Sequence, residues 1–192
     1  MPSQPNTLSR RTLLRAAAVA TAGAGLLAPA SAAAGEASDK IDREVSSALS
    51  HLYARSPAAK DLRKNARGIL VFPRIVKAGF MVGGQTGRGA LRKRGKTAGY
   101  YRSVAVSYGL QAGAQRFGYA LFFMTDDALR YLEQSQGWEI GSGPSVVIVD
   151  EGLAKSLTTT TARSDVYAFF FDQKGLMAGL GLQGSKITRF EP

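Results

Sequence analysis

Apolar residues early in the chain recur with the spacing of one face of an α-helix. The spacing i, i+4, i+7, i+8 and i+11 is followed by Ile41, Val45, Ala48, Leu49 and Leu52, and it predicts an amphipathic helix. Ser38 is placed to cap that helix, and Ser56-Pro57 provides the cap and first-turn proline of a second helix that ends near residue 66. The opposite face of the first helix carries charges of both signs. This favours docking onto a protein core, with attachment to a membrane surface as the alternative.

Residues 68–91 change to a pattern typical of β-strands. Short apolar runs rich in β-branched and aromatic residues break at Pro73 and continue into alternating apolar and glycine positions, which predicts a strand, a turn and a second strand. Glycine normally weakens a strand, so its frequent use predicts bulges, sharp bends or the close approach of another backbone. The glycines concerned are Gly79, Gly83, Gly84, Gly87 and Gly89.

The rest of the chain predicts further strands, one helix and short turns. Strands are expected over residues 98–101, 103–115, 118–124, 145–150, 165–172, 176–182 and 187–190, with a turn at 173–175. Thr125 can cap a helix over 126–134, whose first two aspartates suit the helix dipole. The predicted fold class is therefore α+β: a curved, glycine-rich antiparallel sheet with N-terminal amphipathic helices and one mid-chain helix. The alternative is that the sheet closes into a barrel.

The first 32 residues have the features of an export leader. Arg10 and Arg11 precede a weakly apolar run over residues 16–28, and Ala30-Ser31-Ala32 forms a small-x-small cleavage pattern. This arrangement resembles a twin-arginine signal, and we expect cleavage near Ala32; an uncleaved tail or membrane tether is the alternative. The apolar run is shorter than the roughly 20 residues that span a bilayer. Residues 33–37 are then expected to form a linker and residues 38–192 a single domain, located in the periplasm or outside the cell.

Composition narrows the chemistry that the chain can perform. The 192 residues are 45% hydrophobic and 20% charged, as in an ordinary globular domain, and the formal net charge is +11. With the three arginines of the leader set aside, 22 basic and 14 acidic residues remain. A basic surface favours anionic partners, although solubility alone is the simpler explanation. The chain contains no cysteine, which excludes disulfides, thiolate metal sites, a cysteine nucleophile and a lipidated cysteine anchor.

The candidate catalytic residues form no recognisable constellation. His51 is the one histidine and falls beside core positions of a predicted helix, so a structural role is expected. Asp126-Asp127 suits a helix start and Asp150-Glu151 a strand end. The glycine-rich segment 83–89 lacks the Lys-Ser/Thr of a phosphate-binding loop. We therefore expect no enzymatic activity, no cofactor, no metal site and no nucleic-acid partner.

Basic residues gather around the segment 92–96, which is expected to form an exposed hairpin tip. Two tyrosines beside it have rings suited to the headgroup level of a membrane. Pairing with Glu133 and Glu139 is the alternative role for these cations. The candidate lipid-binding residues are Arg74, Lys77, Arg88, Arg92, Lys93, Arg94, Lys96, Tyr100, Tyr101 and Arg102.

Three sequence blocks resemble the SYLF domain family. They are residues 66–84, which include Gly-Ile-Leu-Val-Phe-Pro and Lys-Ala-Gly-Phe-Met-Val-Gly-Gly; residues 108–115, Tyr-Gly-Leu-Gln-Ala-Gly-Ala-Gln; and residues 174–185. The resemblance spans about residues 38–190. It implies lipid binding, since eukaryotic members bind phosphoinositides, fungal members also bind actin, and bacterial members are mostly exported single-domain proteins or lipoproteins. The expected function is non-enzymatic binding of anionic phospholipids at the cell-envelope membrane. The alternative is an envelope scaffold that binds a protein filament or an acidic polymer.

Overall fold

The computed structural model describes residues 28–80, 82–108, 113–158, 160–175, 182 and 184–192. Its helices are α1 (Ala28–Arg55), α2 (Pro57–Leu62), α3 (Asp126–Gln134) and α4 (Glu151–Ser156). Its strands are β1 (Gly68–Phe80), β2 (Val82–Lys93), β3 (Lys96–Tyr108), β4 (Gly113–Phe123), β5 (Trp138–Glu139), β6 (Val146–Val149), β7 (Val166–Gly175) and β8 (Lys186–Phe190). The predicted α+β class is confirmed.

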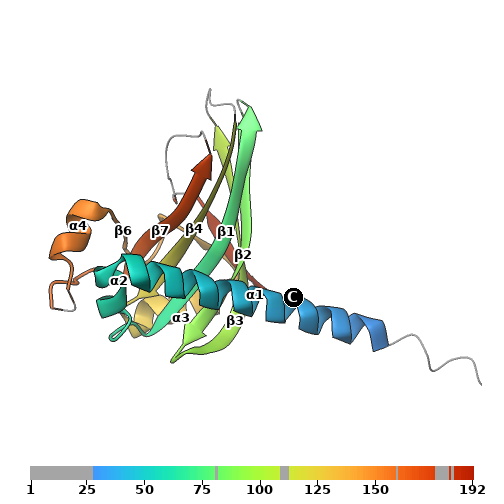
Figure 1. The fold of residues 1–192 in the computed structure, drawn as a ribbon, viewed down its shortest axis with the longest axis horizontal. Helices are drawn as coiled ribbons and strands as arrows, with labels where there is room; N and C mark the ends of the chain where they lie inside the picture. The colour runs from blue at the N-terminus through green and yellow to red at the C-terminus, as the bar shows by residue number, and fades with distance from the viewer. Residues whose placement is uncertain (1–27, 81, 109–112, 159, 176–181, 183) are drawn as a thin grey trace, which may run out of the picture.

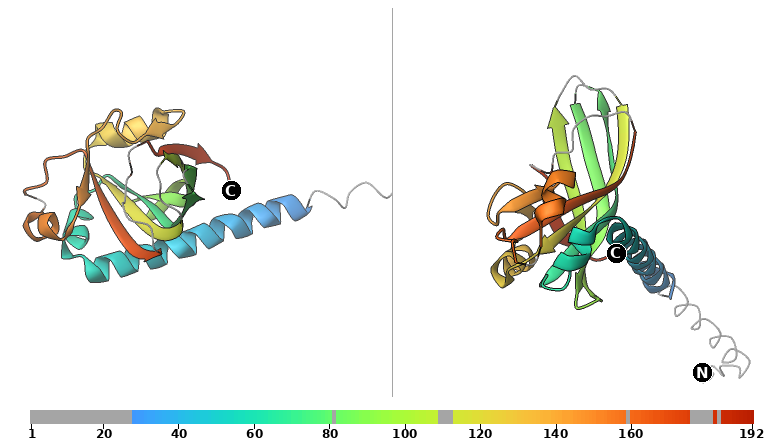
Figure 2. Two further views of the ribbon diagram at one scale, coloured as in Figure 1. Left: turned by 90° about the horizontal axis from the view of Figure 1, so that it is seen from above. Right: turned by 60° about the vertical axis from the view of Figure 1, so that its left-hand side comes forward.

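The strands form one curled sheet in the order β5-β8-β3-β2-β1-β4-β7-β6. Seen from above, the sheet curves into a half-barrel (Figure 2). Every described pairing is antiparallel except that of β6 with β7. The chain between these two strands passes through α4, and such a crossover allows parallel pairing. The sheet is thus curved and mostly antiparallel, as expected, but with one parallel pair at its edge.

Two apolar layers lie on opposite faces of this sheet. The concave face carries Leu70, Phe72 and Tyr119, which pack with Leu129 and Leu132 of α3. The convex face carries Val71, Ala90, Phe122 and Phe169, which pack against the helix α1 and its neighbour α2. The predicted stripe of α1 supplies Ile41, Val45, Ala48 and Leu52 to this second layer. Docking onto the core, the favoured interpretation of that helix, is therefore confirmed.

Helix α1 begins earlier than the sequence pattern suggested. It starts at Ala28, so the expected linker at 33–37 is helical, and Ser38 lies inside the helix instead of capping it. The Ser38 hydroxyl donates to the carbonyl oxygens of Ala34 and Gly35, at 3.1 and 2.8 Å. Alanine is the strongest helix former, and the segment before Ser38 is rich in it. The caps predicted for α2 and α3 are confirmed, since Ser56 and Thr125 accept hydrogen bonds from Ala59 N and Ala128 N.

Some predicted strand boundaries were wrong. The strand expected at 103–115 is divided between β3 and β4, which are separated in the sheet by β2 and β1. The turn expected at 173–175 lies within β7, and the strand expected at 176–182 falls almost entirely outside the described residues. Asp150 follows the end of β6 directly, as expected, and it also caps α4, a helix that was not expected, by accepting a hydrogen bond from Leu153 N at 2.7 Å. These errors arise because apolar runs continue across the points where the chain changes direction.

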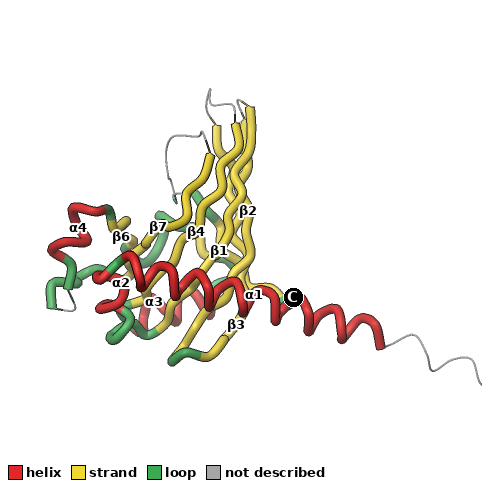
Figure 3. The backbone as a smooth tube through the Cα atoms, viewed as in Figure 1, coloured by secondary structure: helices red, strands yellow, loops and turns green. Residues whose placement is uncertain are grey.

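The upper parts of the long strands β1–β4 extend beyond the helices. α1 crosses the lower half of the sheet, and no described helix lies over the convex side of the upper ends of β1–β4 (Figures 1 and 3). Four valines there, Val76, Val82, Val104 and Val106, have exposed fractions between 43% and 62%. None of the helices in the described ranges combines the length and apolar character needed to cross a bilayer. Among the described residues, the convex side of the upper strand ends is therefore uncovered.

Glycines in β2 allow a close approach to β1, as expected. The register of β1 against β2 shifts between Val71 and Arg74, at a bulge around Pro73. A Cβ atom at Gly89 would lie 2.0 Å from the carbonyl oxygen of Val71, and one at Gly87 would lie 2.5 Å from that of Arg74. Real side chains cannot occupy such positions, so these glycines permit the bulge. The prediction of a nearby backbone is confirmed.

Candidate functional site

The ten candidate binding residues occupy three different places. Arg74, Arg88, Arg92, Tyr100 and Arg102 stand on the convex face, as their register and contacts indicate. Lys77, Lys93 and Tyr101 stand on the concave side. Arg94 and Lys96 lie exposed at the β2–β3 hairpin end. The structure therefore does not bring the ten residues onto one surface, because alternate residues of a strand point to opposite faces.

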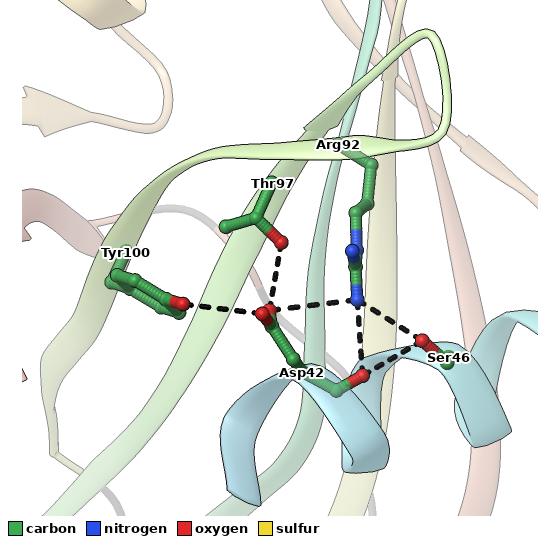
Figure 4. A network of polar contacts seen from close by, with 5 residues as sticks. All are labelled: Asp42, Ser46, Arg92, Thr97 and Tyr100. Atoms are coloured by element: carbon green, nitrogen blue, oxygen red, sulfur yellow. Dashed lines mark hydrogen bonds and ion pairs between the residues drawn. The ribbon is translucent and has the colours of Figure 1, made fainter. Parts of the chain in front are cut away.

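Arg92 is held by helix α1 (Figure 4). One guanidinium nitrogen donates to the Asp42 carbonyl oxygen and to Ser46 Oγ, both at 3.0 Å, and lies 3.5 Å from Asp42 Oδ1. Only 14% of the Arg92 side chain is exposed. Its charge is therefore used to fix the hairpin against α1, and it is poorly placed to meet an external anion.

Asp42 is the centre of the same network. Thr97 Oγ1 donates to Asp42 Oδ1 at 2.7 Å, and the Tyr100 hydroxyl donates to Oδ2 at 3.2 Å (Figure 4). Burial and the neighbouring carboxylate raise the pKa of Tyr100, which keeps its hydroxyl protonated as a donor. Three segments of the chain are thus joined at one carboxylate.

We expect Asp42→Ala to lower the free energy of unfolding by about 2 kcal/mol, because it leaves a mostly buried guanidinium without its carboxylate. Asp39→Ala, at an exposed position of α1, is the control and is expected to change stability by less than about 0.5 kcal/mol. Urea unfolding of both variants measures the difference. Equal stability of the two would show that the network contributes little.

Two further candidate residues, Lys93 and Tyr101, also make contacts within the fold. Lys93 Nζ donates to both carboxylate oxygens of Glu133 on α3, at 2.9 and 3.1 Å. The ring of Tyr101 is buried in the concave layer, so it cannot reach a headgroup. Pairing with Glu133, the alternative role for the basic cluster, is confirmed for Lys93. Glu139 forms no ion pair with these cations in the part of the chain that the structure describes.

Three arginines form a row across the convex face. Arg74 of β1 stands directly opposite Arg88 of β2, and Arg88 stands opposite Arg102 of β3. We call these three residues the arginine row. Like charges directly opposite each other destabilise a sheet. Within the described residues none of the three forms an ion pair with a carboxylate, and all three are exposed.

An aromatic ring supports two members of the row. The guanidinium carbons of Arg88 and Arg102 lie 5.7 and 5.4 Å from the ring centroid of Phe190 on β8. A cation near the face of an aromatic ring is attracted by the ring quadrupole. Phe190 thereby holds two positive groups near each other without neutralising either charge.

Cations that the sequence interpretation missed extend the same face. Arg116 of β4 stands opposite Lys174 of β7, and Lys186 of β8 stands opposite Val104. Strands β1–β4 contain no aspartate or glutamate. Period-two alternation within β4 and β8 could have indicated these residues, but it gives no information on which strands are neighbours. The convex face above α1 is therefore strongly positive.

A second basic region lies at the lower end of the molecule. A cleft of about 970 Å³ runs between the segment 64–67, the β2–β3 hairpin end, α3 and residues 162–164. Most of its charges are already paired: Lys64 with Asp61, Arg67 with Asp126, Lys93 with Glu133 and Arg130 with Asp127. Paired charges attract an external anion weakly, so this cleft is a poorer candidate than the arginine row.

His51, the single histidine, lies on the surface of α1. Its Nδ1 atom is 3.9 Å from a carboxylate oxygen of Asp172, which also pairs with Arg55 at 3.3 Å. Across the described residues, no group of three His, Asp or Glu side chains is arranged to hold a metal ion. The histidine therefore belongs to a surface charge cluster that joins α1 to β7.

Part of the chain matches a known family. Residues 104–191 match the family model Ysc84, described as a Las17-binding protein actin regulator. The matched segment runs from β3 to β8 and includes two of the three blocks that resemble the SYLF domain, residues 108–115 and 174–185. No curated protein matches the sequence.

Proposed function

Because residues 104–191 match the Ysc84 (SYLF) family model, we propose that this chain binds anionic phospholipids at a membrane surface of the cell envelope, without catalysing a reaction. The family is known for lipid and actin binding, which supports a binding role. The proposal includes export through the twin-arginine leader and peripheral attachment after export.

The arginine row is the observation that carries this proposal. Arg74, Arg88 and Arg102 repel one another across neighbouring strands, so the fold gains nothing from their mutual arrangement. An anionic surface would relieve the repulsion. Each basic residue close to such a membrane contributes about 1 kcal/mol, and this attraction fades over a Debye length of about 8 Å at physiological salt.

The second candidate function is an envelope scaffold that binds an acidic polymer or a protein filament. The family description, which names an actin regulator, favours this alternative. The same basic face would carry it, because an acidic filament also presents closely spaced carboxylates. The two functions differ in whether a lipid bilayer alone is sufficient for binding.

Co-sedimentation of the full chain with vesicles tests the proposal. We expect binding to vesicles of phosphatidylcholine mixed with phosphatidylglycerol, little binding to phosphatidylcholine alone, and release as salt is raised. Equal binding to neutral vesicles would exclude the electrostatic mechanism. Failure to bind either vesicle, together with binding to polyglutamate or polyphosphate, would favour the scaffold function.

A further inference from the structure

The convex face above the arginine row is lined by apolar and small side chains. Val76 stands opposite Thr86, which stands opposite Val104, and Gly84 stands between Ala78 and Val106 in the next row. Val82, at the start of β2, belongs to the same face and is 57% exposed. We call Val76, Val82, Val104 and Val106 the valine patch. Apolar β-branched residues on a sheet usually pack against another layer, and none of the described elements covers these.

The valine patch and the arginine row follow each other along the strands. Val82 and Arg88 are six positions apart in β2, which corresponds to about 20 Å at the usual rise per residue. Helix α1 crosses the face just below the arginines, while no element of the described chain covers the strand ends above (Figures 1 and 2). Over β1–β3 the face is therefore positive beside α1 and apolar toward the upper strand ends. Arg116 of β4 and Lys186 of β8 flank the row of Val76 and Val104 on either side.

This order of side chains fits a lipid bilayer better than a second copy of the chain. A symmetric dimer through this face would bring two sets of arginines together, or place arginines on valines, and neither arrangement neutralises the charge. A protein partner normally offers side chains that enter pockets, but small residues such as Ala78 and Gly84 make this surface smooth. The cleft of about 970 Å³ lies at the other end of the molecule.

Helix α1 cannot provide the apolar surface for membrane contact. An amphipathic helix can lie in a membrane surface with its apolar face inserted, but the apolar stripe of α1 is buried against the sheet. The valine patch provides the exposed apolar area that the helix lacks. Arginine side chains have long apolar stems, which allow guanidinium groups to reach phosphates while neighbouring residues enter the membrane.

We propose that the convex face of the upper sheet is the membrane-contact surface: the valine patch enters the headgroup region and the arginine row binds lipid phosphates. This inference rests on the proposed function, because it assigns an orientation to the same lipid binding. It places the concave side, α3 and the lower cleft away from the membrane.

Polarity-sensitive labels at single cysteines test the orientation. The chain has no cysteine of its own, so Val82→Cys and Val106→Cys each give one labelled site, and Gln136→Cys, exposed beyond α3, is the matched control. Each full-length variant is labelled with a nitrobenzoxadiazole probe and mixed with phosphatidylcholine–phosphatidylglycerol vesicles. We expect a blue-shifted, stronger emission at 82 and 106, quenched by nitroxide-labelled lipid, and no change at 136.

The outcomes separate this inference from the proposed function. Sedimentation with vesicles but no emission change at 82 and 106 would overturn the orientation and leave lipid binding intact. Absence of sedimentation would overturn both. An emission change that appears without vesicles and grows with protein concentration would contradict the proposal and show that a second copy of the chain binds this face. An emission change caused only by an acidic polymer would also contradict it and indicate a scaffold partner.

A variant without labels provides a second measurement. Replacing all four valines of the patch by threonine keeps side-chain shape and strand propensity but removes apolar area, and we expect at least a tenfold loss of affinity for anionic vesicles. Ile148→Thr, exposed on β6 at the other edge of the sheet, is the control and should bind as the unchanged protein does. Unchanged affinity of the fourfold variant, with its fold retained by circular dichroism, would contradict insertion.

Discussion

Replacing Arg74, Arg88 and Arg102 together by glutamine is expected to weaken binding to anionic vesicles by about 100-fold. The change removes three charges that each contribute about 1 kcal/mol near an anionic bilayer. Glutamine keeps a polar, uncharged side chain, so the surface stays soluble. Vesicle co-sedimentation over a range of lipid concentrations, at one fixed salt concentration, measures the difference.

The same variant is expected to keep its stability within about 1 kcal/mol. Relief of repulsion between arginines on adjacent strands offsets the loss of the contacts that Arg88 and Arg102 make with Phe190. A large loss of stability would mean that the arginine row has a structural role. Thermal unfolding of the variant therefore distinguishes a binding surface from a part of the fold.

A control with the same change in net charge completes this test. Arg43, Lys60 and Lys155 are exposed on three different helices and form no ion pair within the described residues. Their joint replacement by glutamine is expected to reduce vesicle binding by less than about tenfold, since charges more than a Debye length from the membrane are screened. Equal losses in both triple variants would show that only the total charge matters.

Gly89→Ala is expected to lower the free energy of unfolding by about 3 kcal/mol. The new methyl group would lie 2.0 Å from the Val71 carbonyl oxygen and 2.9 Å from a ring carbon of Phe72, so the backbone of β1 or β2 must move. Moving two strands at a bulge costs more free energy than rotating a side chain. The expected loss therefore lies at the upper end of the free-energy cost that overpacking usually has, about 1–3 kcal/mol. Urea unfolding followed by circular dichroism measures the loss.

Gly84→Ala in the same strand is the matched control. The nearest atom to its new methyl group is 3.9 Å away, which is an ordinary van der Waals contact. Alanine also restricts the unfolded chain more than glycine, so stability should be unchanged or rise by about 0.5 kcal/mol. Similar losses at positions 84 and 89 would show that the close approach to β1 is not the cause.

Local patterns in the sequence determined most of the elements. The apolar spacing of residues 41–52 predicted the buried stripe of α1, and the caps at Ser56 and Thr125 predicted the starts of α2 and α3. The glycines of residues 79–89 predicted the close approach found at Gly87 and Gly89. Each of these signals depends on a few neighbouring residues, because helix periodicity, capping and glycine geometry are local properties of the chain.

The grouping of the basic residues could not be obtained in the same way. Arg92 and Lys93 are adjacent in sequence, yet Arg92 meets α1 on the convex face and Lys93 meets α3 on the concave side. Two of the four cations in residues 92–96 are therefore used within the fold, while Arg94 and Lys96 stay exposed at the hairpin end. Proximity in the sequence overestimated the number of cations that share one exposed surface, because neighbouring residues of a strand point in opposite directions.

The sequence by itself determined most of the strands, three of the four described helices, the basic character and the resemblance to a family. Only the tertiary structure decided that Arg74, Arg88 and Arg102 form a row beside a patch of valines. That row depends on the bulge between Val71 and Arg74 and on the pairing of three strands. Register between strands is set by contacts along their whole length, and a shift of one residue would send each arginine to the other face.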